Sequence, residues 1–113
     1  MNELNEIFET CKTAEEVEQA VMKAITGNST VDEELSESDL EVVFGGMSTW
    51  KAIRIASVGY WELCVKHYNY DRLTYKPAQV SEACNIVEKL CKKGNKAAWT
   101  VYDYAMKLLE ALS

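Results

Sequence analysis

The chain has 113 residues, of which 48% are hydrophobic, and a formal net charge of −6. This length fits one ordinary domain or two small pieces, and the hydrophobic share argues against a globally disordered chain. The acidic total disfavours nucleic-acid binding. A single His and the lack of a glycine-rich phosphate loop leave no constellation for catalysis. We therefore expect no enzyme, no catalytic residue, and no metal or cofactor site.

The charge is divided unevenly along the chain. Residues 1–46 carry twelve acidic and two basic side chains, a net charge of −10, whereas residues 47–113 carry ten basic and six acidic ones, a net charge of +4. All three Trp and all six Tyr also follow Gly46. Such a division predicts two parts with different partners. The alternative is a single fold whose acidic and basic halves pack together.

The chain shows neither a signal peptide nor a membrane-spanning pattern. The first six residues are acidic and lack an apolar run. The most apolar stretch, residues 55–65, has only eleven residues and contains Glu62, so it is too short to cross a bilayer as a helix. We expect that any export uses a route other than the general secretory one.

The N-terminal pattern predicts a helix over about residues 3–26 and a linker over 27–34. Thr13 and Glu16 have the spacing of a capping box, in which each side chain satisfies an amide at the helix end. The apolar residues at helical spacing are Leu4, Ile7, Phe8, Cys11, Val17, Val21, Ala24 and Ile25.

A second cap follows the linker. Ser36 can cap a helix, with Asp39 three residues further on and apolar residues in the staple positions on either side. We predict a short helix over 36–44, which the glycines at 45–46 end. A helix of this length is not stable in water unless it docks on a partner.

Three helical patterns follow residue 46. They are predicted to cover about residues 49–67, a segment that starts at Pro77, and residues 95–112. The first places Trp50, Ile53, Tyr60, Leu63 and Cys64 on one face; the second carries Val80, Ala83, Cys84, Val87, Leu90 and Cys91; the third directs Ala98, Tyr102, Ala105, Leu109 and Leu112 inward. With no strand alternation or hairpin turn in competition, the predicted fold class is all-α.

The four cysteines are Cys11, Cys64, Cys84 and Cys91, and none forms a C-x-x-C pair. Cys84 and Cys91 are two turns apart on one predicted helix, about 10.5 Å by helical rise, which exceeds the reach of a disulfide. A bridge within residues 47–113 would therefore need Cys64. The alternative is that all four are small buried apolar residues.

The segment from Leu35 to Gly46 carries a specific motif. Its pattern is Leu-Ser, two free positions, an acid, Leu, two free positions, an aliphatic residue, one free position and Gly-Gly. The residues that fill it are Leu35, Ser36, Asp39, Leu40, Val43, Gly45 and Gly46. This segment resembles the double-glycine leader of bacteriocin and peptide-pheromone precursors. The helix-in-groove mode of peptide recognition suits its apolar edge, and glycine fits a narrow protease site because it has no side chain.

The resemblance implies that the peptidase domain of a peptidase-containing ABC transporter binds Leu35, Ser36, Asp39, Leu40 and Val43. The peptidase would cut between Gly46 and Met47, and the transporter would export the remainder. The chain is then a precursor: residues 1–46 are a flexible acidic leader with short helices, and residues 47–113 are a small cationic three-helix cargo. The precursor would be cytoplasmic and the cleaved cargo secreted. Residues 1–27 look loosely like the longer leaders found on modified peptides, which would add a maturation enzyme as a partner.

Two uses of the cargo remain open. Its positive charge and its Trp and Tyr residues suit binding to anionic bacterial membranes. This predicts a bacteriocin-like antimicrobial peptide that makes anionic vesicles leak. The other use is as a signalling peptide. Ser81, three residues before Cys84, leaves thioether modification as a further alternative. Outside the leader interpretation, the chain would be an intact acidic helical protein-interaction module that is not processed.

Overall fold

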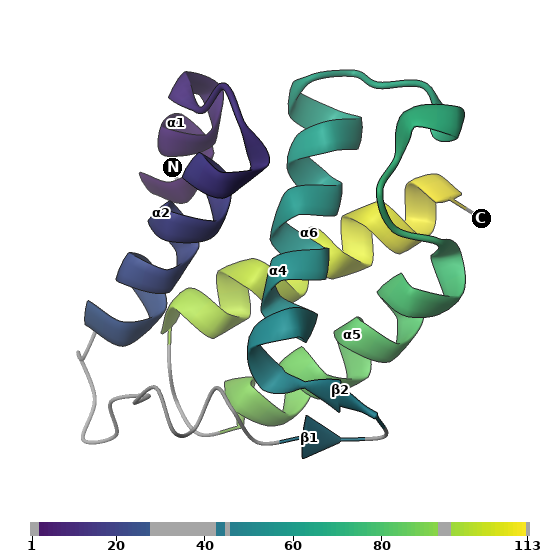
Figure 1. Cartoon of the computed structure of the whole chain (residues 1–113). Coiled ribbons are helices and arrows are strands. Elements are labelled where there is room, and N and C mark those ends of the chain that lie inside the picture. Colours follow the sequence, from purple (N-terminus) through teal and green to yellow (C-terminus); the bar gives the residue numbers. More distant parts are fainter. Residues whose placement is uncertain (1–2, 28–42, 45, 93–95, 113) are drawn as a thin grey trace.

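The computed structural model describes residues 3–27, 43–44, 46–92 and 96–112. Within these ranges the fold is all-α, as predicted. Figure 1 shows α4 in the middle, the α1–α2 pair on one side of it, α5 on the other, and α6 passing behind. The elements are α1 (Glu3–Thr10), α2 (Ala14–Gly27), β1 (Val43–Phe44), β2 (Met47–Ser48), α4 (Thr49–Tyr60), α5 (Pro77–Cys91) and α6 (Lys96–Leu112).

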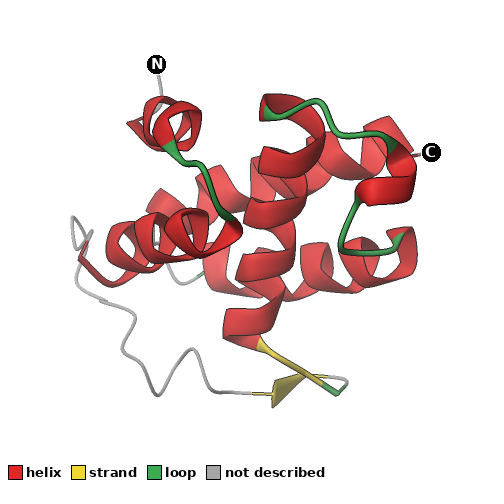
Figure 2. Cartoon of the chain, turned by 45° about the horizontal axis from the view of Figure 1, so that its top comes forward, coloured by secondary structure: helices red, strands yellow, loops and turns green. Residues whose placement is uncertain are grey.

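The predicted helix over residues 3–26 is broken into two helices, α1 and α2, by the turn at residues 11–13 (Figure 2). The capping box explains the break. The amide of Glu16 donates to Oγ1 of Thr13 at 3.3 Å, and the amide of Lys12 donates to Oε1 of Glu16 at 3.2 Å. These bonds satisfy amides that the start of α2 leaves without a helical partner, so a new helix begins here.

Beyond Tyr60 the first C-terminal helix widens into a π-helical turn over Trp61–Val65. The amide of Lys66 donates to the carbonyl of Trp61 at 2.8 Å, which closes this turn. His67 then adopts a φ of +55°, and the chain leaves the helix. A short 3-10 turn over Tyr70–Arg72 leads on to α5.

A buried carboxylate holds the loop between α4 and α5 in place. Glu62 is only 5% exposed, and it accepts hydrogen bonds from the backbone amide of Thr74 at 3.0 Å and from its hydroxyl at 2.6 Å. Two hydrogen bonds to a charged acceptor offset much of the cost of burying it. Glu62 therefore fastens the loop to the end of α4, although it interrupts the apolar pattern of the sequence.

The buried side chains form one core that runs through all five α-helices. The α5 prediction is confirmed, because its six predicted core residues are all buried. The α6 face is shifted from the prediction: Tyr102 and Leu109 are half-buried, while Val101, Tyr104 and Leu108 are buried in their place. The two stripes share Ala98 and Ala105, so periodicity alone does not choose between them.

Gly59 of α4 lies against Leu108 of α6. A Cβ atom built at this position would lie 2.5 Å from Cδ2 of the buried Leu108. Because Leu108 is only 1% exposed, its side chain has little room to move aside. The glycine therefore allows the side chain of Leu108 in α6 to pack directly against the backbone of α4.

The α1–α2 pair is part of this core. Phe8, Val17, Val21 and Ile25 are fully buried. The ring of Phe8 lies 5.2 Å from that of Tyr104 in α6 and 6.4 Å from that of Tyr60 in α4, and the two tyrosine rings are stacked 4.2 Å apart. These three residues, the Phe8 cluster, join the N-terminal helices to the C-terminal bundle.

Truncation of Phe8 tests whether the N-terminal pair belongs to the fold. Phe8→Ala should lower the free energy of unfolding of the whole chain by about 3–5 kcal/mol, the usual cost of emptying a buried phenylalanine site. The matched control is Ile7→Ala, because Ile7 is a neighbour in the same helix with 41% of its surface exposed. Urea unfolding followed by Trp fluorescence measures both. Equal midpoints for the two variants would show that α1 does not contribute to the core.

Candidate functional site

The predicted cleavage site lies in a β-hairpin that joins the segment before α4 to the helix itself. Strands β1 and β2 are antiparallel, with Val43 opposite Ser48 and Phe44 opposite Met47. The predicted helix over 36–44 therefore differs at its C-terminal end, where Val43 and Phe44 are extended. The pairing explains this, because the chain reverses after Phe44 and pairs with the residues that lead into α4.

Gly46 lies in the hairpin loop. It is exposed and adopts a φ of +88°, a conformation that residues with side chains rarely take. A Cβ atom at this position would meet no atom within 4 Å. The turn therefore favours glycine through its backbone conformation, because the surrounding space would accept a side chain.

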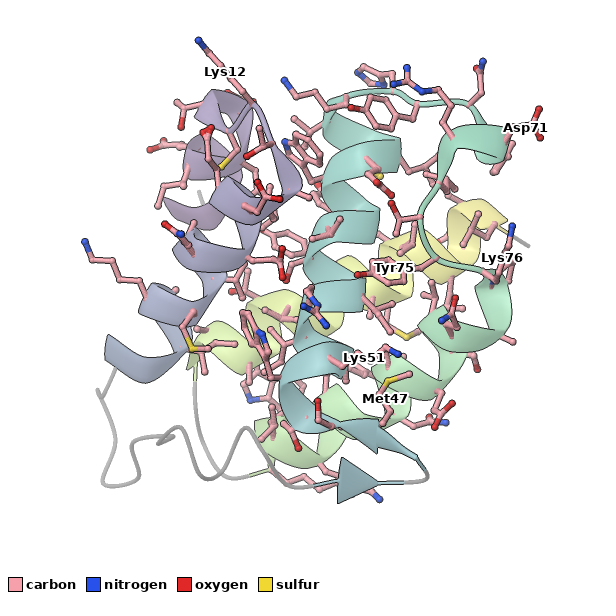
Figure 3. The ribbon with its side chains drawn as sticks, viewed as in Figure 1. Lys12, Met47, Lys51, Asp71, Tyr75 and Lys76 are labelled. Atoms are coloured by element: carbon pink, nitrogen blue, oxygen red, sulfur yellow. The ribbon has the colours of Figure 1, made fainter. Side chains whose placement is uncertain are left out.

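The residue on the other side of the predicted scissile bond is buried. Met47 is 5% exposed and lies next to the start of α4 (Figure 3). Ser48 caps that helix: its Oγ accepts a hydrogen bond from the amide of Lys51 at 3.1 Å. On the N-terminal side of the predicted scissile bond, Gly46 is accessible. On the C-terminal side, Met47 is held by packing and Ser48 by its role as a helix cap.

The structure describes some of the remaining predicted site residues and not others. Leu35, Ser36, Asp39, Leu40 and Gly45 lie outside the described residues, as does most of the segment 28–46, whose packing distinguishes a leader from an intact module. Val43 is described as part of β1. Of the predicted set the structure describes Val43, Gly46 and Met47, which lie in one hairpin.

Sequence reasoning missed the role of Ser48. A serine directly before the apolar pattern that begins at Trp50 is a usual signal for a helix start, and it could have been found. The sequence carries no signal for the burial of Met47. A residue between a glycine turn and a helix cap can be buried or exposed, and the packing of the helices decides which.

The cysteines are free thiols in the structure. Cys11, Cys84 and Cys91 are buried and Cys64 is half-buried, which agrees with the interpretation of these residues as small apolar side chains. Burial raises the pKa of all four thiols, and the pKa of Cys91 reaches about 11. A raised pKa keeps them as neutral thiols, which are poor nucleophiles.

Among the described residues no group of three or more His, Cys, Asp or Glu side chains is placed to hold a metal ion. No described helix is long and apolar enough to cross a membrane.

Comparison with known proteins found no matching family model, no matching curated protein and no matching solved structure.

The raised thiol pKa of Cys91 predicts a loss of stability at alkaline pH. An unfolded thiol ionises near its ordinary value of 9, whereas the folded Cys91 ionises near 11. The unfolded state therefore releases this proton first, and the free energy of unfolding should fall as the pH rises from 9 to 11. Urea unfolding at a series of pH values measures the slope. Cys91→Ala should flatten it relative to the unmodified chain, and identical slopes would refute the assignment.

Proposed function

We propose that the chain is the precursor of a secreted, bacteriocin-like peptide, which a peptidase-containing ABC transporter cuts after Gly46 and exports. The observation that carries the proposal is the complete double-glycine motif between Leu35 and Gly46. Two features support it. The charge changes sign at the same point, and Gly46 is exposed at a turn directly before the three-helix part.

The order of events follows from the hairpin. A peptidase binds the chain on both sides of the scissile bond in extended form, but Met47 is buried and paired with Phe44. The hairpin must therefore open before the bond enters an active site. A ladder of only two residue pairs opens locally at much lower cost than the whole fold. Recognition of the leader by the transporter would supply binding energy for this opening.

The proposal leaves the nucleophile to the peptidase. Residues 1–46 contain one cysteine, Cys11, and its thiol is buried with a raised pKa. In this chain the recognition residues Leu35, Ser36, Asp39, Leu40 and Val43 would dock, and Gly45 and Gly46 would enter the narrow part of the active site, where side chains are not accommodated.

One observation favours the alternative, an intact acidic helical interaction module. The α1–α2 pair is packed into the same core as α4 and α6, with Phe8, Val17 and Val21 fully buried. A single cooperative domain of this kind would work without processing. The length of the chain that accumulates in and outside cells distinguishes the two functions.

Incubation of the full chain with the cognate peptidase domain tests the proposed function. We expect two products, residues 1–46 and 47–113, identified by intact mass. Gly46→Val and Leu40→Ala should each abolish or strongly slow the cut, the first by placing a branched side chain at the scissile bond and the second by removing an anchor. A chain that stays whole, or one cut equally well with both substitutions, would contradict the proposal.

Weakening the cap of α4 tests the requirement for opening. Ser48→Ala removes the acceptor for the amide of Lys51, which costs about 1 kcal/mol at a helix start. If opening precedes the cut, cleavage of the folded chain should become up to about fivefold faster. A synthetic peptide of residues 28–52 with and without the substitution is the control, and its two versions should be cut equally. Unchanged cleavage of the folded chain would mean that the hairpin does not limit the reaction.

A further inference from the structure

The surface where the α1–α2 pair meets the C-terminal bundle is extensive and specific. On the N-terminal side Phe8, Val17, Val21 and Ile25 are fully buried, and Cys11 is 4% exposed. On the other side the stacked rings of Tyr60 and Tyr104 receive Phe8. Side chains so fully removed from water contribute the largest share of an association energy.

Charge also matches across this surface. The segment 3–27 carries six acidic and two basic side chains, whereas residues 47–113 have a net charge of +4. An ion pair crosses this surface: Nη1 of Arg54 in α4 lies 3.1 Å from Oε1 of Glu18 in α2. A planar guanidinium on a carboxylate adds orientation to the apolar contact.

None of these contacts involves the bond between residues 46 and 47. Phe8 and Glu18 belong to α1 and α2, and their partners are Arg54 and Tyr60 in α4 and Tyr104 in α6. Cutting the chain after Gly46 therefore leaves the contacts in place. The cut changes the concentration that governs the association of the two pieces. Before the cut this is the effective concentration set by the linker, and after the cut it is the concentration of the free pieces.

Two hollows lie along the same surface, of about 290 and 260 Å³. The first is bordered by Glu18, Gln19, Met22, Lys23 and Trp50, and the second by Glu9, Tyr60, Cys64, Val65 and His67. Each is lined by residues from both sides of Gly46.

We infer that the α1–α2 pair is a binding partner of the C-terminal bundle in its own right, so that the chain cut after Gly46 persists as a noncovalent complex of an acidic helical hairpin with a basic bundle. The biological consequence rests on the proposed function: proteolysis alone would not free the cargo, and a separate step must pull α1–α2 from the Phe8 cluster. Transport of the cargo as an extended chain would provide that step.

The experiment cuts the folded full chain at a site that does not depend on the transporter. A site for a sequence-specific protease is inserted after Glu34, the chain is purified and cut, and size-exclusion chromatography with native mass spectrometry follows the pieces. We expect them to elute together at about 10 µM and to separate only on dilution or in urea. Elution as two separate species at that concentration, or a homodimer of the C-terminal piece without its N-terminal partner, would overturn the inference.

Two variants make the result specific to this surface. Phe8→Ala should weaken the association of the cut pieces by at least about a hundredfold, whereas Ile7→Ala should leave it nearly unchanged. Since Phe8→Ala can also impair folding before the cut, Glu18→Arg provides a second route. It should weaken the complex several-fold, and Arg54→Glu in the same chain should restore it. Loss without restoration would mean that the pair does not sit at the joint.

The outcome is independent of the proposed function. If the peptidase never cuts after Gly46 but the engineered pieces stay together, the proposed function fails and the inference stands. If the peptidase cuts and the pieces separate at once, the reverse holds.

Discussion

The position of the N-terminal helices on the C-terminal bundle depends on the packing of Phe8 against Tyr60 and Tyr104. This packing brings α1, from the acidic end of the chain, into the same core as α4 and α6, with the two tyrosine rings stacked 4.2 Å apart. Ring pairs of this kind combine large apolar burial with a preferred geometry. The buried apolar stripe of α2 and the ion pair between Glu18 and Arg54 add to this contact.

Under the proposed function, two requirements conflict at residues 43–48. A peptidase substrate needs an accessible, extended chain around its scissile bond, whereas the folded chain needs Met47 buried and Ser48 available to cap α4. Under the proposed function the hairpin would satisfy both in turn, because it is short enough to open locally. Gly46 adopts a positive φ in the closed turn, and in the proposed cleavage its missing side chain would suit a narrow active site.

The division of charge has a second meaning once the fold is known. We expected the acidic and basic parts to have different partners. In the structure the two parts contact each other, through the ion pair between Glu18 and Arg54 and through buried apolar residues. The two sequence interpretations, a leader with its cargo and a single fold of two complementary halves, are therefore compatible. A segment can be packed as part of a domain before it is cut from it.

The sequence by itself determined the all-α class, the capping box at Thr13 and Glu16, the start of α5 at Pro77 and its buried face. These follow from local hydrogen bonds and from 3.6-residue periodicity, which act over a few neighbours. Tertiary packing alone decided that Tyr104 rather than Tyr102 faces inward, that Phe44 is extended, and that the N-terminal pair is part of the core. Each of these depends on contacts between segments far apart in the sequence. An amphipathic stripe predicts that one face of a helix is buried, but it does not predict which segment packs against that face.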